Sequence, residues 1–348
     1  MSRSNARELL ERTTKPIVLV LLVCAHLPAL ATWSVKRLGV LRPTSTTLDI
    51  TTASGVNRGQ VPGAYLLNNQ GRAIIWDIGS GRWRDVHPDI ASNSILYGTD
   101  GNTQVGWLRR ADTSKVVAAL CHGTADSWTL LDPPTASISM AYGVNGNEQV
   151  GFAQIGNSSH ASVWHETADS WVDLNPIGAS ESIAYASDEG TQVGRARTGF
   201  GQRASVWRGT ADSWVDLSPG LFFTSEAYDA QGGQQVGFVN LQGPDHAALW
   251  TGTPESWVDL HPKGFDRSYA YGVDKGFQVG AAHAEGGTFA GLWRGSADTW
   301  LDLSVFLPAH YGSSQANDIW LDGDTIWVLG TAQNLFTFQN DTIVWKGP

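Results

Sequence analysis

Residues 208–217 read RGTADSWVDL, and this stretch decides the fold because it recurs along the chain. Close copies occupy 122–131 (HGTADSWTLL), 165–174 (HETADSWVDL), 251–260 (TGTPESWVDL) and 294–303 (RGSADTWLDL). The tryptophan of the phrase advances by 43 residues from one copy to the next. Self-similarity at such a period indicates a repeat architecture. The chain is therefore expected to use one supersecondary unit many times.

Each unit contains four strand-like segments. In the unit that starts near Ser182 they are SIAYAS, TQVGRAR, RASVW and SWVDL. They are short, rich in β-branched and aromatic residues, and bounded by turn formers such as Glu189-Gly190. Four antiparallel strands in about 43 residues predict one blade of a β-propeller.

A second tryptophan precedes the repeated one by seven residues in most copies, although one copy has Cys121 there. Blades stack face to face, and a buried tryptophan covers a large apolar area. We expect these side chains to form the core between blades rather than a ligand cage. The structural set is Trp76, Trp83, Trp128, Trp164, Trp171, Trp207, Trp214, Trp250, Trp257, Trp293, Trp300 and Trp345.

The number of blades follows from the first strands, which predict an all-β, seven-bladed β-propeller of four-stranded antiparallel blades. These strands begin near Ala53, Leu96, Ala141, Ala184, Ala227, Ala270 and Ala316. The last unit ends without its SWVDL strand, whereas residues 32–43 contain the similar segment WSVKRL. We expect residues 32–43 to complete the last blade and so remove two exposed sheet edges. Six blades with an extra hairpin are the alternative.

The first 31 residues have the pattern of a signal peptide. A basic stretch from Arg3 to Lys15 precedes the apolar run PIVLVLLVCAHLPAL and the small residues of Ala29-Leu30-Ala31. The sequence predicts cleavage after residue 31, leaving 32–348 as a single propeller domain. A retained membrane anchor is the alternative, although the apolar run is shorter than the roughly 20 residues of a spanning helix. The expected localisation is exported: extracellular, cell surface or periplasmic.

The repeat resembles the bacterial extracellular repeats named HAF. The resemblance rests on ASGVNRGQVPG at 53–63, AYGVNGNEQVG at 141–151, HASVW at 160–164 and HAALW at 246–250, and it covers nearly all of residues 33–348. It implies export and a propeller, and it implies no shared catalytic residues.

Motifs for chemistry are missing from the sequence. It contains no G-x-S-x-G elbow, H-E-x-x-H motif, phosphate-binding loop or zinc-spaced cysteines. We considered calcium at Asp318, Asp322 and Asp324, but their spacing does not match a calcium loop. The expectation is therefore no enzyme, no metal and no cofactor. The net charge of −10 and the lack of a basic cluster also argue against nucleic acid.

The expected function is a secreted binding or scaffold module for a glycan or an extracellular protein, monomeric and away from membranes once the signal is cleaved. A polysaccharide-acting hydrolase or lyase is the alternative, and it would need acids unique to one or two blades near the axis. Any site should lie on the variable loops between second and third strands and between blades, which share one face. The candidate ligand-binding residues are Arg203, Phe222, Phe223, Asp245, His246, Phe265, Asp266 and Arg267.

Overall fold

The structure is a computed structural model that describes residues 33–39, 50–53, 55–220 and 224–348. The expected signal peptide, Phe222 and Phe223 lie outside these ranges, as do residues 40–43 of the predicted closing segment. Among the described residues, no helix has the length and apolar character needed to cross a membrane.

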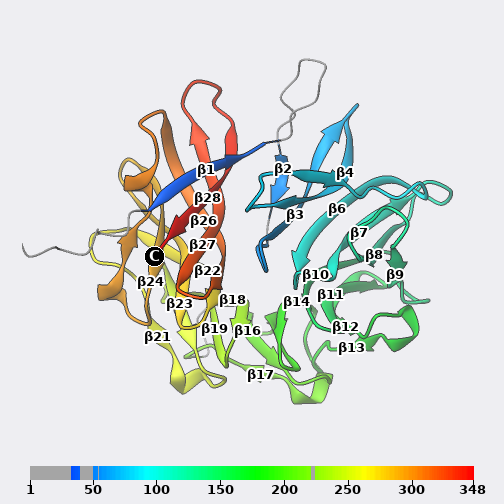
Figure 1. The fold of residues 1–348 in the computed structure, drawn as a ribbon. Coiled ribbons are helices and arrows are strands. Elements are labelled where there is room, and N and C mark those ends of the chain that lie inside the picture. The colour runs from blue at the N-terminus through cyan, green and yellow to red at the C-terminus, as the bar shows by residue number, and fades with distance from the viewer. Residues whose placement is uncertain (1–32, 40–49, 54, 221–223) are drawn as a thin grey trace, which may run out of the picture. The chain divides into compact units, whose positions relative to one another are not determined.

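Seven four-stranded antiparallel sheets follow one another around a common centre (Figure 1), so the predicted seven-bladed propeller is confirmed and six blades are excluded. Blade 1 contains β2 (Ile50–Ala53), β3 (Gln60–Leu67), β4 (Gln70–Asp77) and β5 (Trp83–Asp85). Blade 2 contains β6 (Ala91–Thr99), β7 (Gln104–Arg110), β8 (Val116–Cys121) and β9 (Thr129–Leu130). Blade 3 contains β10 (Ser139–Asn145), β11 (Glu148–Ile155), β12 (Ser158–Trp164) and β13 (Val172–Asp173).

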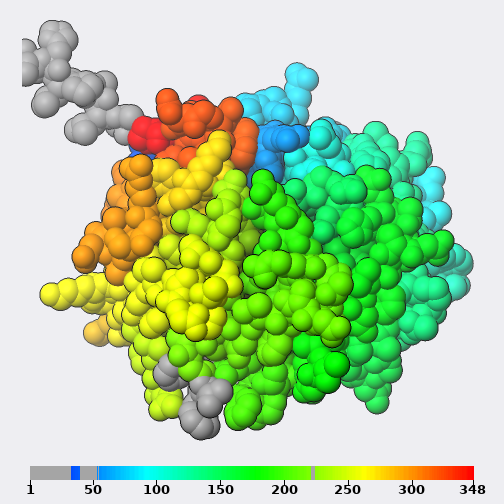
Figure 2. All heavy atoms as spheres, turned by 90° about the horizontal axis from the view of Figure 1, so that it is seen from below, coloured from blue at the N-terminus to red at the C-terminus, as the bar shows by residue number. Residues whose placement is uncertain are grey.

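The remaining blades repeat this order. Blade 4 contains β14 (Glu181–Asp188), β15 (Thr191–Thr198), β16 (Gly201–Trp207) and β17 (Val215–Asp216). Blade 5 contains β18 (Thr224–Gln231), β19 (Gln234–Asn240), β20 (Asp245–Trp250) and β21 (Val258–Asp259). Blade 6 contains β22 (Arg267–Asp274), β23 (Phe277–Ala284), β24 (Gly287–Trp293) and β25 (Leu301–Asp302). Figure 2 shows the yellow to green blades packed side by side on one face of the molecule.

Short 3-10 turns precede the outer strands of blades 3 to 6, where the repeated phrase TADSW bends the chain. They are η1 (Ala168–Ser170), η2 (Ala211–Ser213), η3 (Pro254–Ser256) and η4 (Ala297–Thr299). A fifth, η5 (Ser304–Phe306), leads from blade 6 to blade 7.

Blade 7 contains β26 (Tyr311–Asp322), β27 (Thr325–Asn334), β28 (Asn340–Gly347) and, from the other end of the chain, β1 (Ser34–Leu38). β1 pairs antiparallel with β28 from Ser34 opposite Lys346 to Leu38 opposite Thr342. The predicted closure of the last blade by an N-terminal strand is therefore confirmed for these residues.

The core lies between neighbouring blades, because the tryptophan of each third strand packs on the preceding blade. Trp207 of blade 4, for example, is fully buried against Val150, Val163 and Leu174 of blade 3. The third-strand tryptophans are all completely buried, whereas those of the SWVDL strands are partly buried. Six of the seven interfaces bury such a tryptophan and the seventh, between blades 1 and 2, buries Cys121 in its place, so apolar packing is the main force that joins the blades.

A second inter-blade contact is polar and repeats six times. A buried serine in the first strand of one blade accepts a hydrogen bond from a backbone N–H in the third strand of the preceding blade, as Ser182 Oγ does from Ala161 N at 2.9 Å. We call these side chains the bridging serines: Ser94, Ser139, Ser182, Ser225, Ser268 and Ser314. Each satisfies a buried backbone donor that lies outside its own sheet.

Candidate functional site

The centre of the ring holds a cavity of about 470 Å³, which we call the central bowl. The innermost strands β6, β10, β14, β18, β22 and β26 line it, together with residues 55–58 of blade 1. Its volume falls within the range of small-molecule and peptide side-chain sites. Each blade contributes corresponding positions from its first strand, so copies can be compared directly around the bowl.

A β-bulge in these strands shapes the bowl. The pairing of β18 with β19 shifts register between Ala227 and Asp229, which leaves Tyr228 as the extra residue. Blades 2 to 6 carry tyrosine at this position, and blade 7 carries Asn317. Bulges commonly re-aim a side chain next to a functional site. Here the bulge turns a tyrosine out of the ladder in five consecutive blades.

The five tyrosines form a continuous belt around most of the bowl. Neighbouring ring centroids lie 5.3 to 5.9 Å apart, a normal spacing for aromatic pairs. The members are Tyr97, Tyr142, Tyr185, Tyr228 and Tyr271. Burial raises the pKa of Tyr185 and of Tyr271 to about 12, so these hydroxyls stay neutral at physiological pH.

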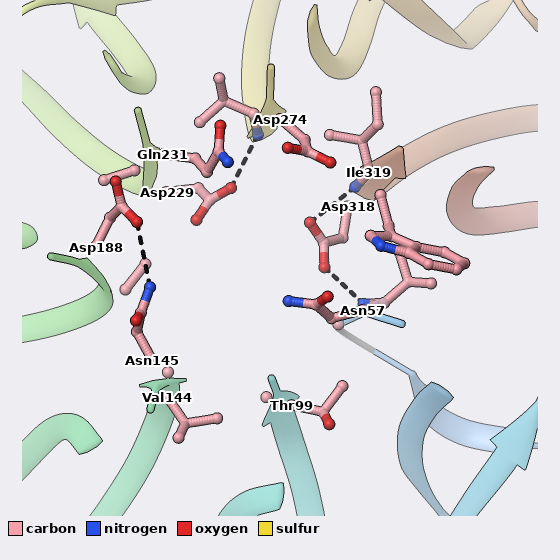
Figure 3. A pocket seen from close by; sticks show the side chains of 18 of the residues that line it. Asn57, Thr99, Val144, Asn145, Asp188, Asp229, Gln231, Asp274, Asp318 and Ile319 are labelled. Atoms are coloured by element: carbon pink, nitrogen blue, oxygen red, sulfur yellow. Dashed lines mark hydrogen bonds between the residues drawn. The ribbon is translucent and has the colours of Figure 1, made fainter. Parts of the chain in front are cut away.

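Four carboxylates lie on one side of the bowl, in blades 4 to 7 (Figure 3). They are Asp188, Asp229, Asp274 and Asp318. Each accepts a hydrogen bond from a backbone N–H of the next blade: Gly232 N at 2.7 Å, Val273 N at 2.9 Å, Leu321 N at 2.6 Å and Val56 N at 2.6 Å, in that order. The last of these bonds joins blade 7 to blade 1. The carboxylates therefore connect the acidic blades to their neighbours as well as facing the bowl.

Asp229 and Asp318 stand where the other five blades carry glycine or alanine: Gly55, Gly98, Gly143, Ala186 and Gly272. Both lie deep in the bowl, where desolvation raises the pKa of Asp229 to about 7 and that of Asp318 well above its usual range. Repulsion from Asp229 adds to the increase at Asp318. Among the described residues, no ion pair involves any of the four bowl carboxylates.

The opposite side of the bowl, in blades 1 to 3, is uncharged apart from Arg58. Figure 3 shows Asn57, Thr99, Val144 and Asn145 lining it. Asn145 Nδ2 donates to Asp188 Oδ1 at 3.2 Å and so links the neutral side to the acidic side.

On the neutral side, the first strands of neighbouring blades also approach each other closely. A Cβ added at Gly98 would lie 2.5 Å from the carbonyl oxygen of Tyr142, and one at Gly143 would lie 2.7 Å from that of Tyr185. Only glycine permits such an approach between backbones. In blades 4, 5 and 7 the same position carries a side chain, so the first strands there leave more room, whereas Gly272 of blade 6 repeats the close approach, since a Cβ there would lie 2.9 Å from the Asp318 backbone.

One further polar group of the bowl lacks a partner. Ser187 belongs to the lining residues at 7% exposure, and its Oγ is inaccessible from the open space of the bowl and makes no hydrogen bond among the described residues. An unsatisfied buried hydroxyl costs free energy unless a ligand or water completes it. Ser187 adjoins Asp188 and therefore belongs to the acidic side.

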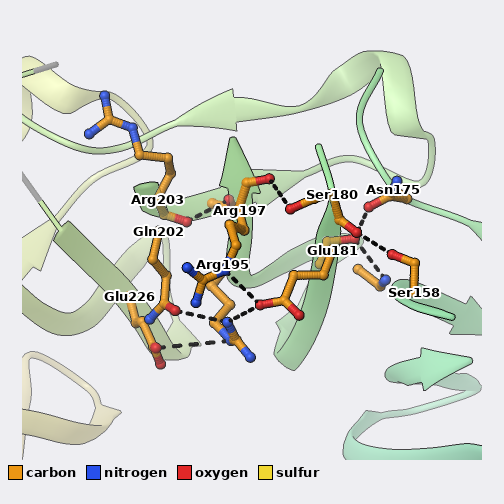
Figure 4. A network of polar contacts seen from close by, with 12 residues as sticks. Ser158, Asn175, Ser180, Glu181, Arg195, Arg197, Gln202, Arg203 and Glu226 are labelled. Carbon is orange, nitrogen blue, oxygen red and sulfur yellow. Dashed lines mark hydrogen bonds and ion pairs between the residues drawn. The ribbon is translucent and has the colours of Figure 1, made fainter. Parts of the chain in front are cut away.

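A separate polar network lies in blade 4 and reaches blade 5 (Figure 4). Arg195 donates to Glu181 at 3.0 Å, to Gln202 at 2.8 Å and to the Tyr185 hydroxyl at 3.1 Å, and its Nε lies 3.9 Å from Glu226. Burial raises the pKa of Glu226, while the adjacent Arg195 opposes that increase. The arginine is already committed to several acceptors, so this network supports the tyrosine belt rather than offering a free cation.

The structure places the predicted loop-face residues in separate local contacts. Arg203 is almost fully buried and pairs with Asp216 at 3.0 Å. His246 pairs with Asp259 at 2.9 Å and stacks on His261, with ring centroids 4.0 Å apart. Asp245 accepts hydrogen bonds from Asn240 and Tyr269.

The other predicted loop residues lie close together between blades 5 and 6. Phe265 packs edge-on against Phe289 and Trp300, at 5.9 and 5.6 Å between centroids. Asp266 and Arg267 are exposed beside it. None of the six predicted residues that the structure describes lines the central bowl. The calcium alternative at Asp318, Asp322 and Asp324 finds no support, because no group of three or more acidic, histidine or cysteine side chains in the described ranges could hold a metal ion.

Exposed apolar side chains gather on the loop face. Antiparallel strand order puts the second-to-third-strand loops and the inter-blade loops on one face of the ring, opposite the first hairpin turns. Apart from Val258, every large apolar residue that is exposed in the described part of the chain lies in or beside these loops: Leu66, Ile90, Ile177, Phe200, Val305, Leu335, Phe336 and Phe338. Most of them stand singly on different blades, whereas Leu335, Phe336 and Phe338 lie together in the loop between β27 and β28.

No family model and no curated protein matches the sequence. Among solved structures, the chain is similar to a prolyl endopeptidase studied for inter-domain dynamics in catalysis and specificity (TM-score 0.55, 10% identity, 86% of this chain and 50% of that chain). It is also similar to a puromycin-hydrolysing peptidase of Mycobacterium tuberculosis (TM-score 0.56, 12% identity, 84% and 53%). A third match is the β-propeller domain of the Trilobed protease from Pyrococcus furiosus (TM-score 0.54, 9% identity, 87% and 94%).

At these identities the likeness establishes the fold. The chain spans about half the length of the first two peptidases, in which the propeller is one part of a longer protein. The propeller of the Trilobed protease is described as having an open velcro topology, whereas β1 closes the last blade here.

The comparisons correct the expected function. Several proteins whose structures are similar to this propeller are peptidases, so the expected non-catalytic binding or scaffold module for a glycan or protein is wrong, and its polysaccharide alternative has no support. The sequence reasoning also missed Asp229 and weighed Asp318 only as a calcium ligand, although AYDAQ and ANDIW replace the glycine or alanine of the other copies.

Proposed function

We propose that this chain handles peptide substrates for a peptide-hydrolysing domain that is separate from the propeller. The central bowl would hold part of an extended peptide, and the second domain would cleave it. The single observation that carries this proposal is the bowl of about 470 Å³ at the centre of the ring. Its polar lining and aromatic belt suit a peptide, which presents backbone hydrogen-bonding groups and side chains together.

The loop face supports the presence of a second domain. Phe336 and Phe338 are 79% and 76% exposed, and Phe200 is 59% exposed. The peptidase chains that share the propeller fold carry about half of their length outside it. A hydrolase domain seated on the loop face would cover these side chains and remove apolar area from water. The bowl, at the hairpin-turn side of the ring, would remain accessible.

Two sequence predictions remain part of the proposal. The apolar segment at 16–30 and the HAF-like motifs support export of the chain and membership of that repeat family. Fractionation of cells that express the full chain tests export, because the mature protein should leave the cytoplasm about 31 residues shorter. A full-length product confined to the cytoplasm would contradict it.

A peptide-binding assay tests the function. The full-length protein should bind a blocked, fluorescein-labelled pentapeptide, Ala-Ala-Gln-Ala-Ala, and should leave it intact when no other protein is added. Asn57→Trp narrows the bowl, which the Asn57 side chain lines in Figure 3, and should weaken binding at least tenfold. Ile177→Trp, on the loop face at 93% exposure, is the matched control and should bind normally.

Two outcomes would overturn the proposal. One is unchanged peptide binding by Asn57→Trp, which would place the peptide elsewhere. The other is cleavage of the peptide by the purified chain alone, which would place catalysis in the propeller.

A further inference from the structure

We propose that the junction between blades 5 and 6 contains a pH-sensitive latch, in which protonation of His261 releases the bridging serine Ser268 and loosens the loop at 261–267. The latch consists of His261, the histidine stacked on it, His246, and Ser268. It lies on the loop face of the ring, away from the central bowl, and it does not depend on what the bowl binds.

A chain of hydrogen bonds fixes the uncharged form of His261. Its Nε2 lies 3.0 Å from the Phe265 carbonyl oxygen, which can only accept, so this nitrogen carries the hydrogen. Its Nδ1 lies 2.8 Å from Ser268 Oγ and is left to accept the hydroxyl hydrogen. Ser268 Oγ in turn accepts the Ala247 N–H of blade 5 at 2.9 Å. Every group in this chain has a partner as long as His261 is neutral.

Protonation of His261 removes an acceptor from the chain. A hydrogen on Nδ1 would direct a second donor at Ser268 Oγ, and the Ser268 hydroxyl would lose the nitrogen to which it donates. Ser268 is fully buried, so water does not reach it while the junction is closed. Because a buried donor without a partner is costly, the charged form of His261 favours a junction that has opened to water.

A second histidine is stacked on His261. The ring of His246, from β20, lies 4.0 Å away between centroids and is inclined by only 11°. His246 Nδ1 also pairs with Asp259 Oδ2 at 2.9 Å. Two charged imidazoles in this face-to-face arrangement repel each other. The stack therefore adds to the cost of charging His261 in the closed junction.

The charges around His261 leave the effect of burial dominant. Burial is the main cause of its lowered pKa, and His246 adds to the decrease. The Phe265 carbonyl and two carboxylates, Asp259 and Asp266, oppose it. The other neighbours add no buried charge, since they are either exposed or aromatic: Lys263, Arg267, Phe289 and Trp300.

The sign of the pH response follows from this direction. A histidine whose pKa is lowered in the closed junction binds a proton more tightly once the junction opens. The junction is therefore most stable above the ordinary pKa of 6.5 and weakens as the pH falls below it. The buried carboxyl of Asp229 has the opposite dependence, so the latch is measured at a local amide rather than by global melting.

Other blades carry uncharged versions of the same junction. In blade 3, Asn175 accepts the Ser182 hydroxyl at 2.7 Å and donates to the Ala179 carbonyl at 3.3 Å, so an asparagine makes both bonds without titrating. In blade 4, Ser218 contacts Ser225 at 2.7 Å. The fold itself therefore does not require a histidine at this position.

The histidine of blade 1 makes the same two bonds. His87 contacts Ser94 Oγ at 2.7 Å and the Ala91 carbonyl at 3.1 Å, but no aromatic ring among the described residues stacks on it. The stacked pair is thus particular to the junction of blades 5 and 6, and blade 4 supplies the control.

Amide hydrogen exchange in the full-length protein tests the latch. Between pH 7.5 and pH 5.0, protection of the Ala247 N–H, corrected for the intrinsic exchange rate, should fall by roughly tenfold, the loss of about one hydrogen bond. The Ala204 N–H, which Ser225 Oγ accepts at 2.9 Å, is the internal control and should change by less than about twofold. An equal change at both amides would overturn the proposal.

Two variants separate the titration from the structure. His261→Asn reproduces the bonds of Asn175 and should keep Ala247 equally protected at both pH values. His246→Phe, which introduces the residue found at this place in blade 6 as Phe289, keeps a ring on His261 without a charge and should reduce the response at least about twofold. A response that persists unchanged in His261→Asn would overturn the proposal.

Folding of both variants is checked by near-ultraviolet circular dichroism. If His261→Asn does not fold, the titration of the wild-type His261 ring, followed by nuclear magnetic resonance, decides the question. A ring that is still neutral at pH 6.5 supports the latch, and one that is already mostly protonated at that pH overturns it.

Discussion

The two sides of the central bowl use the same strand for different purposes. In blades 1 to 3 the position after the bulge is glycine, and the first strands approach so closely that Gly143 has no room for a Cβ. In blades 5 and 7 the same position holds a carboxylate that reaches the next blade through a hydrogen bond. The comparison shows that the residues shared by all copies build the blades. The acidic side chains of the bowl, in contrast, occur where single copies differ from the repeat. Four changes would break or sharpen this contrast.

The largest effect should come from moving an acid to the neutral side. Gly143→Asp would bring a side chain within 2.7 Å of the Tyr185 carbonyl and add a buried charge. Overpacking and charge burial together should lower the free energy of unfolding by about 3 kcal/mol or more. Chemical denaturation measures it. The reverse change, Ala186→Gly, should cost less than about 1 kcal/mol, and equal effects would refute the difference in spacing.

The pH dependence of stability should come from the acidic side. A carboxyl with a raised pKa holds its proton more tightly in the folded protein. Its contribution is therefore complete below the ordinary pKa near 3.8 and is lost as the pH rises towards about 7, the pKa of Asp229. Partial contact with water in the bowl limits the loss to roughly 1–2 kcal/mol.

Thermal melts from pH 4 to pH 8 test this prediction in the wild type and in Asp229→Ala. Asp188, Asp274 and Asp318 face the same space, as does Lys275, so the variant should flatten the profile without abolishing it. A profile identical to that of the wild type would contradict the assignment to Asp229.

Loss of a bridging serine should destabilise the protein equally in a blade of the neutral side and in a blade of the acidic side. Ser94→Ala and Ser182→Ala each leave a buried backbone N–H, of Ala73 or Ala161, without an acceptor. Each should lower the free energy of unfolding by about 1–2 kcal/mol, and denaturant titrations should agree within about 0.5 kcal/mol. A clear difference between the two would show that the contrast extends beyond the bowl.

The smallest effect should come from the bond that joins the two sides. Asn145→Ala removes the 3.2 Å hydrogen bond to Asp188, and both residues retain access to water. The unfolding free energy should change by no more than about 0.5 kcal/mol. A larger loss in a denaturant titration would mean that the two sides depend on each other.

The repeat made the fold predictable from the sequence, whereas the central bowl was less predictable. The spacing of Trp171, Trp214 and Trp257 defined the blades, and WSVKRL identified the strand that pairs with β28. The acids of the bowl were also visible in the copies that read AYDAQ and ANDIW. Their position in the bowl depends on the β-bulge and on residues of blades that are distant in the sequence. The local sequence pattern does not reveal such contacts. The loop residues were chosen for variability, which does not reveal that Arg203 is buried.

The pairing of β1 with β28 has a mechanical consequence. Ser34 lies opposite Lys346, so the two ends of the closing ladder leave the sheet next to each other. A force that pulls these ends apart acts on the outermost hydrogen bond first and then on the next, rather than on the whole ladder at once. Such peeling requires less force than shearing two strands lengthwise. Under tension the ring should therefore open at blade 7, while the other six blades are still intact.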